Sequence, residues 1–312
     1  MKRKAATAFA CLVTCAPALA APDPVPPPSP VAIRISDVAL FYQLYDAAHG
    51  RPSAQTLQDA YLDAGTDGLR EFIPDRIRSA DALAQKVADE PAIYEKARSC
   101  MGALPTVRTR LEGAFRRLRA LDPQATFPPV TVVVGRNNSG GTTGPSGVII
   151  GLEVACGADW MQSDPADRLY HLIAHEYGHV EQPPSVNEES TDTNVLKQSL
   201  AEGVAELVAA LISGEVSNAH LEQWTKGREE AIGHAFIADA HKSDLSDWLY
   251  NGQGTPEHPG DLGYWAGYHI ARAYYDKAAD KRRALRILLD LKDPDAILRD
   301  SGWPAATQTA RP

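Results

Sequence analysis

The pattern His175-Glu176-Tyr177-Gly178-His179 constrains the fold of this chain more than any other feature of its 312 residues. Two histidines four residues apart share one face of an α-helix, because four residues advance the helix by about 400°, one turn plus about 40°. Their imidazoles can then hold one small metal ion. Glu176 can face the same cleft without being a ligand, which leaves it able to take a proton from a metal-bound water. The alternative is two ordinary surface or core histidines.

The residues around this pattern predict a helix with clear ends. Asp164 is a favourable N-cap, Pro165 suits the first helical position, and Pro183-Pro184 ends the helix. Apolar residues recur inside it at helical spacing: Leu169, Leu172, Ile173 and Val180.

A catalytic zinc ion needs a third protein ligand and one open position for water. Residues 180–190 contain no histidine, so a third histidine shortly downstream is excluded. Glu202 lies 23 residues after His179, on a second helix expected from about Val195 to Ile212. We rank four other candidate ligands below it, three acids in a predicted loop and one histidine beyond the helix end: Glu188, Glu189, Asp192 and His220.

The second helix carries two carboxylates on the side opposite its leucines. Glu202 and Glu206 lie about 40° apart there, and only small residues flank them: Ala201, Ala205 and Ala209. Such a helix is expected to be buried on both sides, and buried carboxylates are costly unless they are paired or metal-bound. We therefore predict Glu202 as the third ligand and Glu206 as the acceptor for the free N–H of a metal-binding histidine. The alternative is a solvent-facing glutamate pair.

The first twenty residues have the layout of a secretory signal peptide: three positive residues, an apolar run, and Ala18-Leu19-Ala20 as a cleavage site. The run is too short to span a bilayer, so we expect an exported protein, periplasmic or secreted, that is not an integral membrane protein after cleavage. A retained membrane anchor is the alternative, and lipidation at Cys15 is a minor one.

Removing residues 1–20 takes away three positive charges and no acidic residue, so the formal net charge moves from −9 to −12. Nucleic acid and anionic lipid surfaces repel such a protein, and no dense Lys/Arg stripe offsets this, so we expect no nucleic-acid partner. Two cysteines remain, Cys100 and Cys156. An oxidising compartment and an even count favour one disulfide, with two separate buried thiols as the alternative.

The remaining patterns predict an α+β fold that is mostly helical, with a small β-sheet. Apolar spacing is helical from Ile35 to about Leu121, whereas Val130–Val134 and Val148–Leu152 are predicted strands that form a hairpin-like pair around a flexible loop. We expect a signal peptide (1–20), a proline-rich linker (21–34), a helical N-terminal region (35–125), a catalytic region (126–304) and a tail (305–312).

A further helix is expected from about Gly263 to Ala278, and it carries Tyr264 and Tyr268 on one face. Either phenol could donate a hydrogen bond to a developing oxyanion, and we name Tyr264 as the candidate. An aromatic core patch is the alternative. Three further histidines are each expected at the surface: His234, His241 and His258.

The chain resembles the predicted zinc-dependent protease family known as domain-of-unknown-function family 2268. The segments that carry the resemblance are Phe127–Arg136, Asn138–Thr142, Ile150-Gly151, His175–His179, Leu200–Glu206 and Gly263–Tyr268. It covers roughly residues 35–303. It implies a gluzincin-like (zincin) fold, one Zn²⁺ ion and hydrolysis of peptide bonds.

Together these features predict an exported zinc metallopeptidase that acts on a peptide or protein, with Glu176 activating a zinc-bound water. One of the two predicted strands is expected to pair with extended substrate along its edge. Two alternatives stay open: a non-catalytic cell-envelope binding protein with a vestigial or structural zinc site, and a zinc amidase acting on a non-protein amide.

Overall fold

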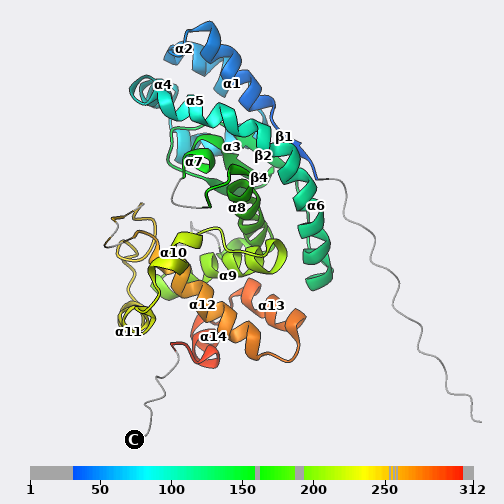
Figure 1. Ribbon diagram of the computed structural model, residues 1–312, viewed down its shortest axis with the longest axis vertical. Helices are drawn as coiled ribbons and strands as arrows, with labels where there is room; N and C mark the ends of the chain where they lie inside the picture. Colours follow the sequence, from blue (N-terminus) through cyan, green and yellow to red (C-terminus); the bar gives the residue numbers. More distant parts are fainter. Residues whose placement is uncertain are drawn as a thin grey trace, which may run out of the picture.

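The computed structural model describes residues 31–158, 162–186, 193–252, 254–255, 257 and 259–304 (Figure 1). Over these residues the protein is mostly helical and has one small mixed sheet, which confirms the predicted α+β class. The predicted signal peptide, linker residues 21–30 and the tail lie outside the described residues. None of the described helices is long and apolar enough to cross a membrane.

The N-terminal region is helical, as its apolar spacing predicts. Phe41 packs against Tyr42, Tyr61 and Tyr94, with ring centroids between 5.3 and 5.7 Å apart. The Tyr61 hydroxyl donates to the carbonyl of Val134 (2.8 Å) and so fastens these helices to the sheet. The helices are α1 (Ser36–Ala47), α2 (Ala54–Leu57), α3 (Asp67–Phe72), α4 (Ala80–Asp89), α5 (Pro91–Cys100) and α6 (Leu104–Leu121), with π-helical turns at Gln58–Leu62 and Ile73–Ile77 and a 3₁₀ turn at Met101–Ala103.

The sheet has four strands in the order β1-β2-β4-β3. The strands are β1 (Ile33–Arg34), β2 (Val130–Val133), β3 (Gly141–Gly144) and β4 (Gly147–Gly151). β2 is parallel to both β1 and β4, whereas β3 is antiparallel to β4. β2 and β4 are fully buried, which fits their nearly continuous run of Val and Ile. β3 is half-buried and forms one edge.

Three predictions about the sheet are wrong. The predicted strands β2 and β4 do not form a hairpin-like pair, because they run parallel. The segment between them, predicted as a flexible loop, contains β3, which pairs with β4 through a two-residue turn at Pro145-Ser146. Gly-Thr-Thr-Gly has no apolar alternation, so local patterning gives no strand signal there. Ile33 and Arg34, assigned to the linker, instead form β1.

The second half of the chain is a stack of helices in which α9 packs against both α8 and α12 (Figure 1). These elements are α7 (Leu152–Gly157), α8 (Pro165–Val180), α9 (Val195–Ser213), α10 (Ala219–Trp224), α11 (Glu229–Asp239), α12 (Leu262–Lys277), α13 (Lys281–Asp290) and α14 (Pro294–Ser301), with a 3₁₀ turn at Pro184–Val186. Cys100 at the end of α5 and Cys156 in α7 form a disulfide, the first of the two arrangements left open by the sequence.

Candidate metal centre

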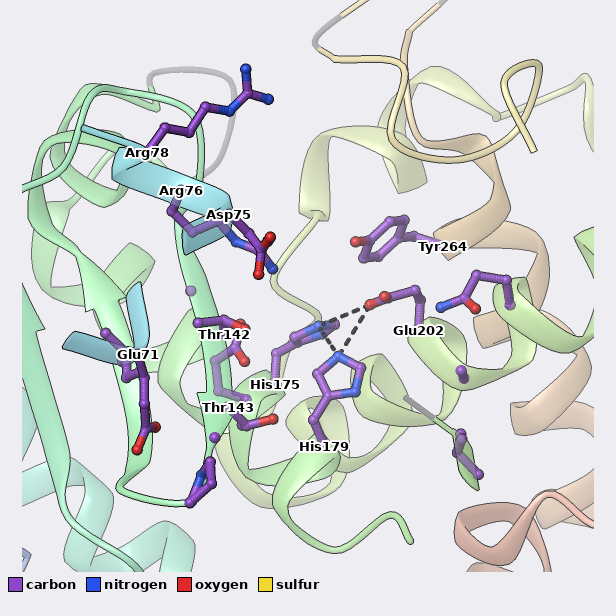
Figure 2. Close-up of a pocket in the computed structure, with 18 residues that line it drawn as sticks. Glu71, Asp75, Arg76, Arg78, Thr142, Thr143, His175, His179, Glu202 and Tyr264 are labelled. Atoms are coloured by element: carbon purple, nitrogen blue, oxygen red, sulfur yellow. Dashed lines mark hydrogen bonds and ion pairs between the residues drawn. The ribbon is translucent and has the colours of Figure 1, made fainter. Parts of the chain in front are cut away.

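Helix α8 presents the two histidines of the His-Glu-x-x-His pattern side by side. The helix begins as predicted, because the Asp164 side chain accepts a hydrogen bond from the backbone N–H of Ala166 (2.7 Å) and Pro165 occupies the first position. One turn apart on the buried face, His175 and His179 place their Nε2 atoms 3.1 Å from each other. Both nitrogens therefore point at one small volume (Figure 2).

Helix α9 brings Glu202 to the same volume. Its Oε2 atom lies 3.1 Å from His179 Nε2 and 3.4 Å from His175 Nε2. The three atoms form a triangle whose sides match the distance of about 3.3 Å between neighbouring ligands in a tetrahedral site with metal–ligand bonds of about 2.0–2.2 Å. Two imidazole nitrogens and a carboxylate oxygen are also ligands that zinc accepts. The residues present therefore fit a zinc ion.

Glycines let the helices that carry these residues approach closely. A Cβ atom on Gly178 of α8 would lie 2.5 Å from the Cα atom of Ala205 in α9. A Cβ atom on Gly203 would lie 2.0 Å from the carbonyl carbon of Gly267 in α12. Real side chains do not tolerate such distances, so α9 can sit between α8 and α12 at this depth only with glycine at these positions. We call these contacts the glycine seam.

Burial of both α9 carboxylates is confirmed, since Glu202 and Glu206 are each 1% exposed. Glu206 Oε1 lies 3.3 Å from His175 Nδ1, the nitrogen that faces away from the cluster. Glu206 also accepts hydrogen bonds from the backbone N–H of Ser217 (2.6 Å) and the side-chain amide of Asn218 (2.9 Å). Because a carboxylate only accepts, it favours the His175 tautomer with its proton on Nδ1, which leaves Nε2 for a metal.

Gln182 does the same for His179, and it was not predicted. Its Oε1 atom lies 2.8 Å from His179 Nδ1, and its Nε2 donates to the carbonyl of Ala201 (2.8 Å). The second bond identifies the amide nitrogen, so the oxygen faces the histidine and accepts from Nδ1–H. The only sequence signal is a polar residue three positions after His179, just past the helix end.

Charge in the cluster favours bound cations. Burial by itself would lower the pKa of His175 and His179, but the negative charges of Glu206 and Glu202 outweigh it. The pKa of His179 rises to about 8 and that of His175 lies well above its usual value. Burial would raise the pKa of Glu202, yet the facing histidines hold it below the usual range. A divalent cation would supply the same positive charge that protons supply here.

Glu176 lies beside the cluster and is also buried, in a cavity of about 720 Å³ that the three cluster residues line. Its carboxylate packs against β3, where a Cβ atom on Gly141 would lie 2.3 Å from Glu176 Oε1. The wall of the cavity that faces Glu202 consists of β3 and the segment from Glu71 to Arg78 (Figure 2). Glu71 accepts a hydrogen bond from the backbone N–H of Ser146 (3.1 Å), which braces the turn between β3 and β4.

The two candidate tyrosines lie in different surroundings. Tyr264 lines the cavity and stacks on the His175 ring, with centroids 6.0 Å apart and planes 25° apart. Its hydroxyl points into the cleft near Glu202 (Figure 2). Tyr268 lines a separate hollow beside Glu206. The geometry therefore brings Tyr264, and not Tyr268, to the cluster.

The lower-ranked ligand candidates do not join the cluster where they can be placed. His220 is outside the group formed by His175, His179 and Glu202. The three acids of the predicted loop, Glu188, Glu189 and Asp192, lie outside the described residues, as does His258. His234 and His241 are exposed, as predicted.

Residues 145–289 match the family model described as "Predicted Zn-dependent protease (DUF2268)". This confirms the resemblance over a shorter span than the sequence motifs suggested, and the span contains α8, α9 and α12. No curated protein and no solved structure matches the chain.

Proposed function

We propose that this protein is a zinc-dependent metallopeptidase with a gluzincin-like site, in which His175, His179 and Glu202 hold the metal. The observation that carries the proposal is the triangle formed by the two Nε2 atoms and Glu202 Oε2, with sides of 3.1, 3.1 and 3.4 Å. The family match supports the same reading, because its description names a zinc-dependent protease.

An open site favours catalysis over a structural role. Structural zinc sites usually have four protein ligands and are closed, whereas catalytic sites have three and leave a position for water or substrate. Three described side chains form this cluster, and they face a cavity large enough for several residues of a peptide. A non-catalytic binding protein with a closed zinc site is therefore the weaker alternative.

Glu176 is the proposed general base. A zinc ion bound here would polarise the scissile carbonyl and make water more acidic. Glu176 takes the proton from the attacking water as the water oxygen bonds to the carbonyl carbon. It then passes that proton to the nitrogen of the leaving amine, and the C–N bond breaks as the C=O double bond forms again. Gly141 assists by leaving room for the carboxylate against β3. Tyr264, which lines the cavity and stacks on His175, is the proposed donor of a hydrogen bond to the oxygen of the tetrahedral intermediate.

The edge of β3 is the proposed docking site for an extended substrate. The sequence suggested β2 or β4 for this role, but both are interior strands of the sheet. Bonded and non-bonded pairs alternate between antiparallel strands, and the carbonyl of Gly140 accepts from the N–H of Gly151 (3.0 Å). By this alternation Thr143 turns its backbone N–H and C=O away from β4, to the outer edge of β3. Because Thr143 also lines the cavity, we propose that a peptide bound there pairs with these groups.

Export is also part of the proposal. The layout of residues 1–20 supports it, and so does the Cys100–Cys156 disulfide, because such bonds persist mainly in oxidising compartments. The substrate would then be a peptide or protein of the periplasm or the medium.

The test compares wild type with Glu176→Gln for zinc content and for hydrolysis of a mixed peptide library. We expect about one zinc per chain in both, with hydrolysis lowered about 100- to 10,000-fold in the variant. Glu112→Gln, on the exposed face of α6, is the matched control and should behave like wild type. Zinc in both proteins without hydrolysis in either would contradict the peptidase and leave the metal site standing.

A further inference from the structure

The two oxygens of Glu202 have different partners. Oε2 faces the two histidines, as described above, whereas Oε1 accepts a hydrogen bond of 2.8 Å from the hydroxyl of Tyr250. Tyr250 precedes α12 by a loop and is not among the residues that line the cavity. Its hydroxyl therefore reaches the carboxylate at the oxygen that does not face the two histidines.

Gln198 determines the direction of the Tyr250 hydroxyl. The side-chain amide of Gln198 donates to the Tyr250 oxygen at 2.8 Å, so that oxygen acts as an acceptor toward α9. The hydroxyl hydrogen is then left for Glu202, since a carboxylate can only accept. Gln198 is buried in α9, one turn before Glu202, which ties the direction of this hydrogen bond to the same helix that carries the ligand.

The backbone around Tyr250 is held in an uncommon conformation. Tyr250 has φ of 58° and Asp261 has φ of 61°, both in the left-handed region that favours glycine. The Asp261 carboxylate accepts hydrogen bonds from the backbone N–H groups of Tyr250 and Asn251, and Asn251 Oδ1 accepts from the N–H of Asp261 (2.7 Å). A bulky residue in this region is strained, and such strain concentrates at functional positions. In this conformation Tyr250, which is 49% exposed, turns its hydroxyl toward the buried carboxylate of Glu202.

We infer that Tyr250 is a positioning residue that keeps Glu202 a one-oxygen ligand of the proposed zinc ion. A carboxylate that is held by one oxygen can swing to bind through both, and the second oxygen would then compete for the position that water or substrate needs. The Tyr250 hydrogen bond occupies Oε1 and orients Oε2 toward the histidines. Each of the three ligands thus has its own partner: Glu206 for His175, Gln182 for His179 and Tyr250 for Glu202. This inference rests on the proposed zinc site.

The test measures zinc affinity of wild type, Tyr250→Phe and a control, Tyr274→Phe, by competition with a chromophoric chelator. Tyr274 is a half-buried tyrosine of α12 away from the cluster. We expect Tyr250→Phe to bind zinc about 10- to 100-fold more weakly, and Tyr274→Phe to match wild type. Loading with Co²⁺ gives a second readout: the visible absorption should weaken in Tyr250→Phe as the metal gains a second oxygen from Glu202.

The outcomes separate the inference from the function on which it rests. Zinc affinity within about twofold of wild type, together with an unchanged Co²⁺ spectrum in Tyr250→Phe, would overturn the role of Tyr250 and leave the zinc site intact. A wild type that binds neither metal would overturn the proposed function itself. Equal thermal unfolding of the metal-free variant and wild type establishes that a lost affinity comes from the hydroxyl and not from misfolding.

Discussion

The two sides of the cleft are built by different means. The helical side, made of α8, α9 and α12, supplies the three cluster residues and is packed through the glycine seam. The strand side, made of the sheet with helices α1 to α5 and α7, supplies the half-buried edge β3 and is held by aromatic contacts and a disulfide. Groups that need fixed geometry thus lie on the closely packed side, and groups that would meet variable substrates lie on the more open one.

We expect the largest effect on zinc content and activity from a substitution on the helical side. Glu202→Gln keeps the shape of the side chain but removes the charge that favours a cation, so zinc should be lost on dialysis. Without the metal, hydrolysis should fall about 1000-fold or more. Metal analysis and peptide assays measure both effects. A variant that keeps stoichiometric zinc and activity would show that Glu202 is not the ligand. The helical side would then not supply the metal site as described.

Loss of the disulfide should affect only the strand side. Cys100 and Cys156 are 56 residues apart, so the bond restricts a long loop of the unfolded chain and should contribute about 4 kcal/mol. The double variant Cys100→Ser/Cys156→Ser should unfold at lower denaturant concentration, whereas its zinc affinity should not change. A reducing agent should lower the stability of wild type and leave the double variant unaffected. Weaker zinc binding in this variant would show that the two sides are coupled.

A methyl group in the glycine seam should affect both stability and the site. Gly203→Ala places a Cβ atom 2.0 Å from the carbonyl carbon of Gly267, so α9 and α12 must move apart. We expect a loss of about 2 kcal/mol and weaker zinc binding, because Glu202 is the adjacent residue. Gly113→Ala, inside α6, is the control with the opposite sign: its Cβ atom meets only ordinary contacts, so it should stabilise by about 0.5–1 kcal/mol. Thermal unfolding of the two variants measures both changes in stability, and they should have opposite signs.

The smallest effect is expected at β3. Thr143→Pro removes a backbone N–H that points away from β4, and one lost hydrogen bond corresponds to a KM for long peptides about 2- to 10-fold higher. Zinc content and stability should change little, because the ladder to β4 does not use this N–H. Thr143→Val keeps the backbone donor and should resemble wild type. An unchanged KM in the proline variant would argue against substrate pairing along this edge.

Local signals predicted the helical side well. Residues at the ends of α8 and α9 cap these helices in the structure. In α9, the Asn194 side chain accepts a hydrogen bond from the N–H of Lys197 (2.9 Å), and Gly214 ends the helix with φ of 100°. The spacing of His175 and His179 and the small residues around Glu202 reflect one helix period, so the cluster was predictable before any pairing of helices was known.

Contacts between distant segments were not predictable in the same way. β1 and β3 are strands because of their neighbours, since two residues or a Gly-Thr-Thr-Gly segment have little strand preference of their own. Whether β2 and β4 run parallel depends on the path of the chain between them. Tyr250 reaches Glu202 across 48 residues of sequence through a loop with no periodic pattern, and nothing local distinguishes it from any other exposed tyrosine.

The short strand β1 has a consequence for the order of events during synthesis. Ile33 pairs with Val130, so the strand that leaves the ribosome early has no partner until nearly a hundred further residues have been made. At about 5–20 residues per second this interval is of the order of 5–20 seconds. β1 therefore pairs with β2 late, after the N-terminal helices have had time to pack around their own aromatic residues. The strand side of the cleft can form only when the middle of the chain has been synthesised.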